Sequence, residues 1–241
     1  MDSSERDGRT HAPRIAFGNT KSAPPKTGST RARVLLFLLS AIILTLLLFI
    51  APPALLAQED TLLEGHLQVD NPANLTALDA ELLYQRLLPK MIQGYILSGR
   101  PDARNYKRWT RYNSAPYRSS QHGQRFINNY GNDLAADYAF FEQAEQLPEG
   151  ARLAKDSFTV TSAGTVFPGP LFLMEKMARG FNQASGDWRY SMIMPDGSLF
   201  GETKGVGDKQ VTFCSDCHAQ AANLDQLYFL PPAYRLPQSE D

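Results

Sequence analysis

The sequence has few of the residues that form metal sites or disulfide frameworks. Its 241 residues include only two cysteines and four histidines. Two cysteines form at most one disulfide, which excludes a disulfide-stapled scaffold and favours one short functional motif. An excess of charge is also absent, since 24 Lys+Arg residues stand against 25 Asp+Glu residues. Nucleic-acid-binding proteins are usually basic, so we expect no nucleic-acid partner.

Long hydrophobic runs are scarce as well, with the exception of Val34–Ala51. A helix of these 18 residues spans about 27 Å, enough for a thin hydrocarbon core. Residues 1–33 are basic and aperiodic, which predicts a disordered cytoplasmic tail and places the rest of the chain across the membrane. The run is either an uncleaved anchor or a signal peptide cut near Ala57. Both interpretations predict a periplasmic domain, anchored to the inner membrane by residues 34–51 in the first case.

The remaining sequence is organised as a linker over residues 52–70 and one domain over residues 71–241. Apolar spacing predicts a helix over Leu75–Leu97, capped by Asn74 and kinked or split at Pro89. A second helix is expected over Asp133–Glu145. No helical crossover separates the strand candidates, so we expect an α+β domain with a mainly antiparallel sheet and flanking helices. The strand candidates are Arg125–Tyr130, Arg152–Val160, Leu171–Met177, Trp188–Met194 and Ser198–Thr203.

The motif with the clearest chemistry is CSDCH, which runs from Cys214 to His218. In a translocated protein, C-x-x-C-H indicates covalent attachment of one c-type haem. Two thiols three positions apart can reach the two vinyl groups on one edge of the porphyrin. The adjacent His218 can then bind the iron as proximal ligand.

Other interpretations of the two cysteines are weaker. A thioredoxin-like redox pair would need a βαβ context, and a structural zinc site needs four ligands. A Cys214–Cys217 disulfide would close only a tiny loop. A second axial ligand would make an electron carrier. His122 is the other histidine well inside the folded region, but a lone histidine in a polar loop is more often solvated, so we expect an open distal side.

Two charged residues lie on predicted strands. Alternation places Glu175 on one face with Leu171, Leu173 and Met177. It is either an edge charge or ion-pair partner, or a pocket carboxylate with a raised pKa that can accept protons. Lys155 shares a face with Leu153 and Ser157, and the pattern alone favours a solvated lysine.

Residues 80–235 resemble the cytochrome P-460 family, which also includes the cytochromes c prime-beta. C-x-x-C-H is common to many cytochromes, but its place near the C-terminus after a Trp-bearing hairpin is more specific. The matching pieces are Arg108-Trp109, Asn113, FINNY at 126–130, Pro148-Glu149-Gly150, Leu153-Ala154-Lys155, GPLFLMEK at 169–176, Gly186-Asp187-Trp188, Cys214–His218 and Asp225.

The resemblance implies a homodimer with a five-coordinate haem bound by His218. Members of the P-460 type carry an extra covalent bond between a strand lysine and the porphyrin, and they oxidise hydroxylamine with a pocket carboxylate as proton acceptor. Lys155 and Glu175 look like the counterparts of these two residues. Cytochromes c prime-beta instead have an apolar distal pocket and bind nitric oxide without turnover. Phe126, Phe158 and Phe172 are candidates to line such a pocket.

Three functions follow as hypotheses. The first is redox chemistry on a small nitrogen compound, hydroxylamine or nitric oxide, with an electron-transfer partner protein. The second is non-catalytic binding of nitric oxide or carbon monoxide, and the third is simple electron transfer. The first makes the protein a possible hydroxylamine-oxidising oxidoreductase.

Overall fold

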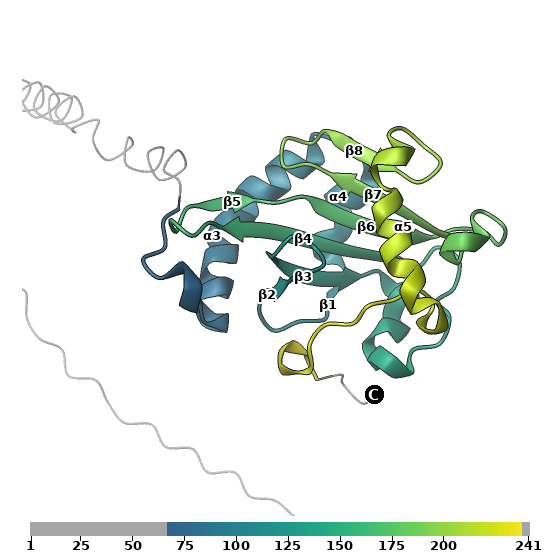
Figure 1. The fold of residues 1–241 in the computed structure, drawn as a ribbon, viewed down its shortest axis with the longest axis horizontal. Coiled ribbons are helices and arrows are strands. Elements are labelled where there is room, and N and C mark those ends of the chain that lie inside the picture. Colours follow the sequence, from purple (N-terminus) through teal and green to yellow (C-terminus); the bar gives the residue numbers. More distant parts are fainter. Residues whose placement is uncertain (1–66, 238–241) are drawn as a thin grey trace, which may run out of the picture. The chain divides into compact units, whose positions relative to one another are not determined.

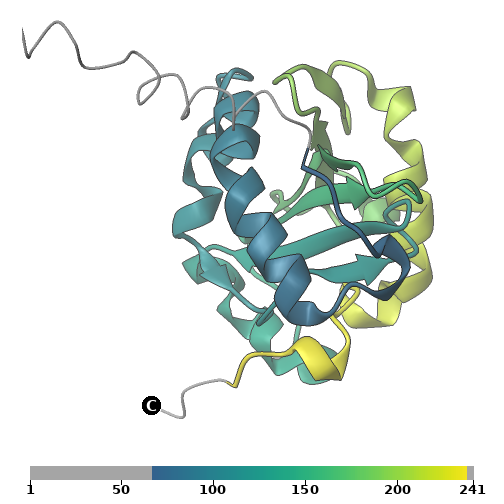
Figure 2. The same cartoon turned by 90° about the vertical axis from the view of Figure 1, so that its left-hand side faces the viewer.

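The computed structural model describes residues 67–237, which form an antiparallel sheet with helices on both faces (Figures 1 and 2). The main strand order is β1-β3-β4-β6-β7-β8, while β2 also pairs with β3 and β5 with β4. Every named pairing is antiparallel, so the predicted α+β class with a mainly antiparallel sheet is confirmed. The strands are β1 Thr110–Arg111, β2 Tyr117–Ser119, β3 Arg125–Gly131, β4 Arg152–Val160, β5 Val166–Pro168, β6 Leu171–Lys176, β7 Trp188–Ile193 and β8 Leu199–Glu202.

The long helix α3, Ala77–Ile96, covers one face of the sheet (Figure 2). Its N-cap is Thr76 rather than the predicted Asn74, because Thr76 and Asp79 form a reciprocal capping box. Of the two effects predicted for Pro89, the split is wrong, since the helix continues through this residue. Pro89 is exposed, so water can bind the carbonyl that the missing N–H leaves free.

The remaining helices are short, and several differ from the sequence prediction. The segment expected as an α-helix over Asp133–Glu145 is the 3₁₀ segment η4, broken by non-helical backbone at Ala135 and Phe141. On the sheet face opposite α3 lies α5, which carries the C-x-x-C-H motif (Figure 1). The other elements are η2 Pro72–Asn74, α4 Pro101–Asn105, η3 Tyr106–Arg108, η4 Asp133–Gln143, η5 Gln183–Ser185, η6 Asp208–Gln210, α5 Thr212–His218, η7 Ala219–Leu224 and η8 Pro232–Tyr234.

Strand alternation divides the core into two clusters. Ala154 and Phe158 of β4 belong to the cluster that packs beneath α3. Leu153, one position from Ala154, belongs to a second cluster that includes Trp188 and Cys214. Neighbouring residues of one strand therefore face different surroundings, as the two-residue period of a strand requires.

The predicted tail, membrane run and most of the linker lie outside the described residues. Within residues 67–237, none of the helices has both the length and the apolar character that crossing a membrane requires.

Candidate functional site

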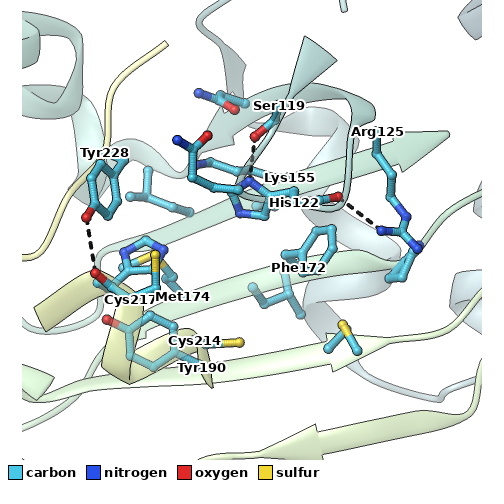
Figure 3. Close-up of a pocket in the computed structure, with 18 of the residues that line it drawn as sticks. Ser119, His122, Arg125, Lys155, Phe172, Met174, Tyr190, Cys214, Cys217 and Tyr228 are labelled. Carbon is cyan, nitrogen blue, oxygen red and sulfur yellow. Dashed lines mark hydrogen bonds between the residues drawn. The ribbon is translucent and has the colours of Figure 1, made fainter. Parts of the chain in front are cut away.

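A cavity of about 630 Å³ lies between the sheet and α5 (Figure 3). Its walls come from the β2–β3 hairpin, from β4, β6 and β7, from α5 and from the chain that follows α5. Apolar side chains cover much of its surface, among them Leu153, Phe172 and Met192. This volume is in the range of pockets that accept cofactor-sized ligands.

Cys214 and Cys217 line this cavity from α5. They stand three positions apart on one helix, so their side chains lie on the same side of it. Both thiols are free and half-buried. Burial raises the pKa of Cys214 to about 11, which is the opposite of the lowered pKa that a redox-active thiol needs. The thioredoxin-like alternative is therefore disfavoured.

His218 also lines the cavity, with an orientation that its neighbours determine. Its Nδ1 lies 2.7 Å from the carbonyl oxygen of Gln226. A carbonyl only accepts hydrogen bonds, so Nδ1 carries the proton and Nε2 keeps its lone pair. The rings of Tyr190 and Tyr228 pack on His218 with centroids 5.2 and 5.3 Å away. Burial lowers the pKa of His218 to about 4, so the imidazole is neutral at pH 7.

The segment after α5 is attached to the sheet by Asp225. One of its carboxylate oxygens pairs with the ammonium of Lys176 at 2.5 Å, and the other accepts a hydrogen bond from the backbone N–H of Leu147 at 3.0 Å. Trp188 Nε1 donates to the backbone carbonyl of Asp225 at 2.8 Å. These contacts hold Gln226, and through it His218, in position.

Lys155 reaches the cavity from β4, on the wall that faces α5 (Figure 3). Within residues 67–237 its ammonium forms neither a hydrogen bond nor an ion pair, and the half-buried side chain faces the cavity. Burial lowers the pKa of Lys155 to about 8, while the thiol of Cys217 acts in the opposite direction. The cavity wall therefore carries an amine without a protein partner.

The β2–β3 hairpin brings two further polar groups to the cavity, His122 and Arg125. The sequence predicts a solvated loop residue at His122, and it gives no signal for Arg125. The Nδ1 of His122 lies 2.8 Å from the hydroxyl of Ser119. The buried Nε of Arg125 has no hydrogen-bond partner among the described residues. The β2–β3 hairpin turns this polar loop toward the site, and strand β2 was not predicted.

Glu175 is not a pocket carboxylate, and that prediction is wrong. The predicted alternation holds, but its face of β6 is turned away from the cavity. The carboxylate pairs with Arg152 at 2.8 Å and with Arg189. Although burial opposes it, hydrogen bonding to these two guanidinium groups leaves the pKa of Glu175 below its usual value. Phe126 and Phe158 also lie on that face, stacked beneath α3, and only Phe172 of the three aromatic candidates lines the cavity.

The fold and the site together define a candidate c-type haem protein: an antiparallel sheet with a cavity, and one helix presenting two thiols and a neutral imidazole. A family model described as Cytochrome P460 matches residues 103–229, which is more than half of the chain, and the chain belongs to this family. The family implies a c-type haem with iron and suggests chemistry related to hydroxylamine. No curated protein matches the chain.

The residues present fit a haem. The cavity has room for a flat macrocycle, and its α5 wall offers two unpaired sulfurs beside an imidazole nitrogen with a free lone pair. A haem also carries carboxylates at one edge of the porphyrin, and these need a cationic hydrogen-bond donor. The buried Nε of Arg125, which lacks an acceptor, can be that donor. Within residues 67–237 no group of three or more His, Cys, Asp or Glu side chains could hold a metal ion without a cofactor.

Proposed function

We propose that the protein is an extracytoplasmic cytochrome with one covalently attached haem, which carries out redox chemistry on a small nitrogen compound. The observation that carries this proposal is the arrangement on α5. Two free sulfurs and an imidazole lone pair face one cavity, and the family match covers all three residues.

Each residue of α5 has a distinct role in this proposal. Cys214 and Cys217 would form the thioether bonds to the porphyrin, and His218 would ligate the iron through Nε2. The carbonyl of Gln226 fixes the tautomer and the orientation of that ligand. When bound, the haem would supply an iron that can accept electrons and bind a small molecule.

Lys155 is the candidate for an additional bond to the porphyrin. Its amine has no protein partner, it lies on the cavity wall, and its pKa of about 8 leaves a fraction neutral at neutral pH. A neutral amine is the nucleophilic form of a lysine, and exchanging a porphyrin C–H bond for a C–N bond also releases two protons and two electrons, which an external two-electron oxidant would have to accept. The apolar lining around it, with Phe172 on the neighbouring strand, suits a small uncharged ligand such as hydroxylamine or nitric oxide.

The apolar lining also favours the second function, in which the protein binds nitric oxide or carbon monoxide without turnover. The two functions differ in whether electrons leave the site. Catalysis needs an electron-accepting partner protein, whereas ligand binding does not. The remaining parts of the proposal, a homodimer in the periplasm with residues 34–51 as anchor or signal, rest on the family resemblance and on the N-terminal sequence.

The test begins with covalent haem. Full-length protein produced in cells with an active haem-attachment system is expected to carry one haem, measured by mass and by haem absorbance in denaturing gels. Cys214→Ala together with Cys217→Ala should abolish covalent haem, and His218→Ala should alter the iron spectrum. Asp216→Ala, an exposed position between the two cysteines, is the matched control and should load normally. A colourless wild-type protein would refute the proposal.

The spectrum and the turnover then separate the alternatives. A red-shifted Soret band that Lys155→Met restores to an ordinary c-type position would support the additional bond. Hydroxylamine oxidation with an artificial electron acceptor would support catalysis. Tight nitric oxide binding without that oxidation would select the binding function, and a low-spin six-coordinate ferric spectrum would select electron transfer.

A further inference from the structure

We propose that His122 is a hydrogen-bond donor of this site, acting on the small ligand that the haem iron would bind. The inference rests on the proposed function, because it needs a haem in the cavity. It concerns a residue for which the sequence predicts a solvated histidine in a loop. Glu175 lies on the other face of the sheet, so its carboxylate cannot be the polar group that contacts this ligand.

The first support is the way the hairpin holds the imidazole. Strands β2 and β3 pair Ser119 with Arg125, and His122 lies on the turn between them. The guanidinium of Arg125 donates to the backbone carbonyl of His122 at 3.0 Å. The His122 ring meets Phe172 of β6 edge to face, with centroids 5.0 Å apart. Backbone and ring are therefore both fixed against the cavity wall (Figure 3).

The second support is the hydrogen bond at Nδ1. The Ser119 hydroxyl lies 2.8 Å from this nitrogen, and among the described residues it makes no other hydrogen bond. Its proton is therefore directed to Nδ1, which leaves the other ring nitrogen, Nε2, protonated and free to donate. Ser119 is itself buried, so bulk water has little access to its hydroxyl.

The third support is the electrostatic surrounding. Burial lowers the pKa of His122 strongly, and the charge of Lys155 acts in the same direction. A neutral imidazole with a fixed Nε2–H is a donor at all moderate pH values. Lys155 cannot take this role if its amine is bonded to the porphyrin.

Azide and carbon monoxide together test this donor. Azide on the ferric protein accepts a strong hydrogen bond, whereas carbon monoxide on the ferrous protein accepts a weak one. His122→Leu keeps the bulk but removes the donor. We expect azide to bind about tenfold more weakly, and carbon monoxide to change by less than about twofold. Both are measured by spectral titration, after haem content has been checked by mass.

Positioning by Ser119 is tested in the same assay. Ser119→Ala should weaken azide by about threefold, because the ring loses its tautomer preference, and Ser119→Thr should restore it. Gln124→Asn is the control: this exposed residue lies on the same turn, outside the cavity lining, and asparagine tolerates its left-handed backbone (φ 60°).

The failures of the two proposals are distinguishable. Absence of covalent haem in the wild type refutes the proposed function. Normal haem loading with an azide affinity unchanged in His122→Leu, or lowered in parallel with carbon monoxide, refutes the role of His122. A low-spin wild-type spectrum that becomes high-spin in His122→Leu also refutes it, because His122 would then be an iron ligand. If His122→Leu loads no haem, the azide affinities of Ser119→Ala and Ser119→Thr test the role of His122 instead.

Discussion

Two neighbouring residues of β4 show how differently the two faces of the sheet treat a buried charge. Asp156 faces α3, where its carboxylate accepts hydrogen bonds from Tyr84 at 2.6 Å, Tyr106 at 3.1 Å and Asn128 at 2.9 Å. Lys155 faces the cavity and, within residues 67–237, has no hydrogen-bond or ion-pair partner. A buried polar group is expensive unless it is paired. The α3 face therefore satisfies the Asp156 carboxylate within the protein, while the cavity face leaves the Lys155 amine without a partner among the described residues.

The polar network around Asp156 extends toward the surface. Lys107 donates to the hydroxyls of Tyr84 at 2.8 Å and Tyr130 at 2.5 Å. Burial still raises the pKa of Asp156 despite these donors. The comparison teaches that a charged side chain with no protein partner at all, rather than a buried charge or a single unpaired nitrogen, marks the cavity face, since Arg100 and Arg111 also have a buried Nε without a partner in the described part of the chain but lie outside the cavity lining. Lys155 meets this criterion, and His122 and Arg125 line the same cavity.

The strongest way to break this comparison is to substitute the two β4 residues separately. Asp156→Ala leaves three buried donors without an acceptor, and we expect the free energy of unfolding to fall by about 4 kcal/mol. Lys155→Met deprives no protein group of a partner, so its change should stay within about 1 kcal/mol where mass analysis shows that the amine is not bonded to the porphyrin. Guanidinium denaturation of the haem-loaded proteins measures both. Equal losses would mean that Lys155 has a structural partner and would remove the contrast.

A second pair sharpens the comparison within the cavity face. Lys176 of β6 lies on the same side of the sheet as Lys155, but it forms a buried ion pair with Asp225, both side chains being 6% exposed. Lys176→Met should lower the free energy of unfolding by about 3 kcal/mol, because it leaves the Asp225 carboxylate buried and unpaired. The exposed Lys209→Met is the control, with an expected change below about 0.5 kcal/mol. A loss as small as that of the control would show that the pair does not hold the loop.

Much of the fold could be predicted from sequence because it depends on local patterns. The strands β3, β4, β6, β7 and β8 were found within a residue or so of their ends by alternation and turn residues. Short strands such as β1 and β2 carry too few residues for a pattern. The η4 segment has the apolar spacing of a helix but follows a 3₁₀ path with a break at Phe141, where φ is 54°. Such a break depends on tertiary packing, which spacing does not report.

The site was predictable only where a motif contains its own geometry. C-x-x-C-H specifies three groups on one helix, and the structure places all three at the cavity. Glu175 and Lys155 gave the same signal, a charge on a strand, but alternation cannot say which face of a sheet meets a cavity. That depends on α3 and α5 lying on opposite faces. His122 was missed as a cavity residue because its neighbours in space, Ser119 and Phe172, are brought to it by a hairpin and a distant strand.

The smallest expected effect concerns Glu175 and its two arginine partners on the face of the sheet that α3 covers. The pKa of Glu175 is lowered in the folded protein, so the folded state favours the carboxylate. Its stabilisation is present above the ordinary glutamate pKa of about 4.3 and is lost as the pH falls through the folded pKa. Because the Arg152 side chain is 39% exposed, we expect only about 1 kcal/mol. Glu175→Gln should therefore lower the denaturation midpoint more at pH 7 than at pH 3, whereas the exposed Glu149→Gln should lower it at neither pH. The same Glu175→Gln protein should keep the azide affinity of the wild type, because the carboxylate lies on the far side of the sheet from the cavity. A variant with normal stability but altered ligand binding would return Glu175 to the site and reverse the assignment of the two faces.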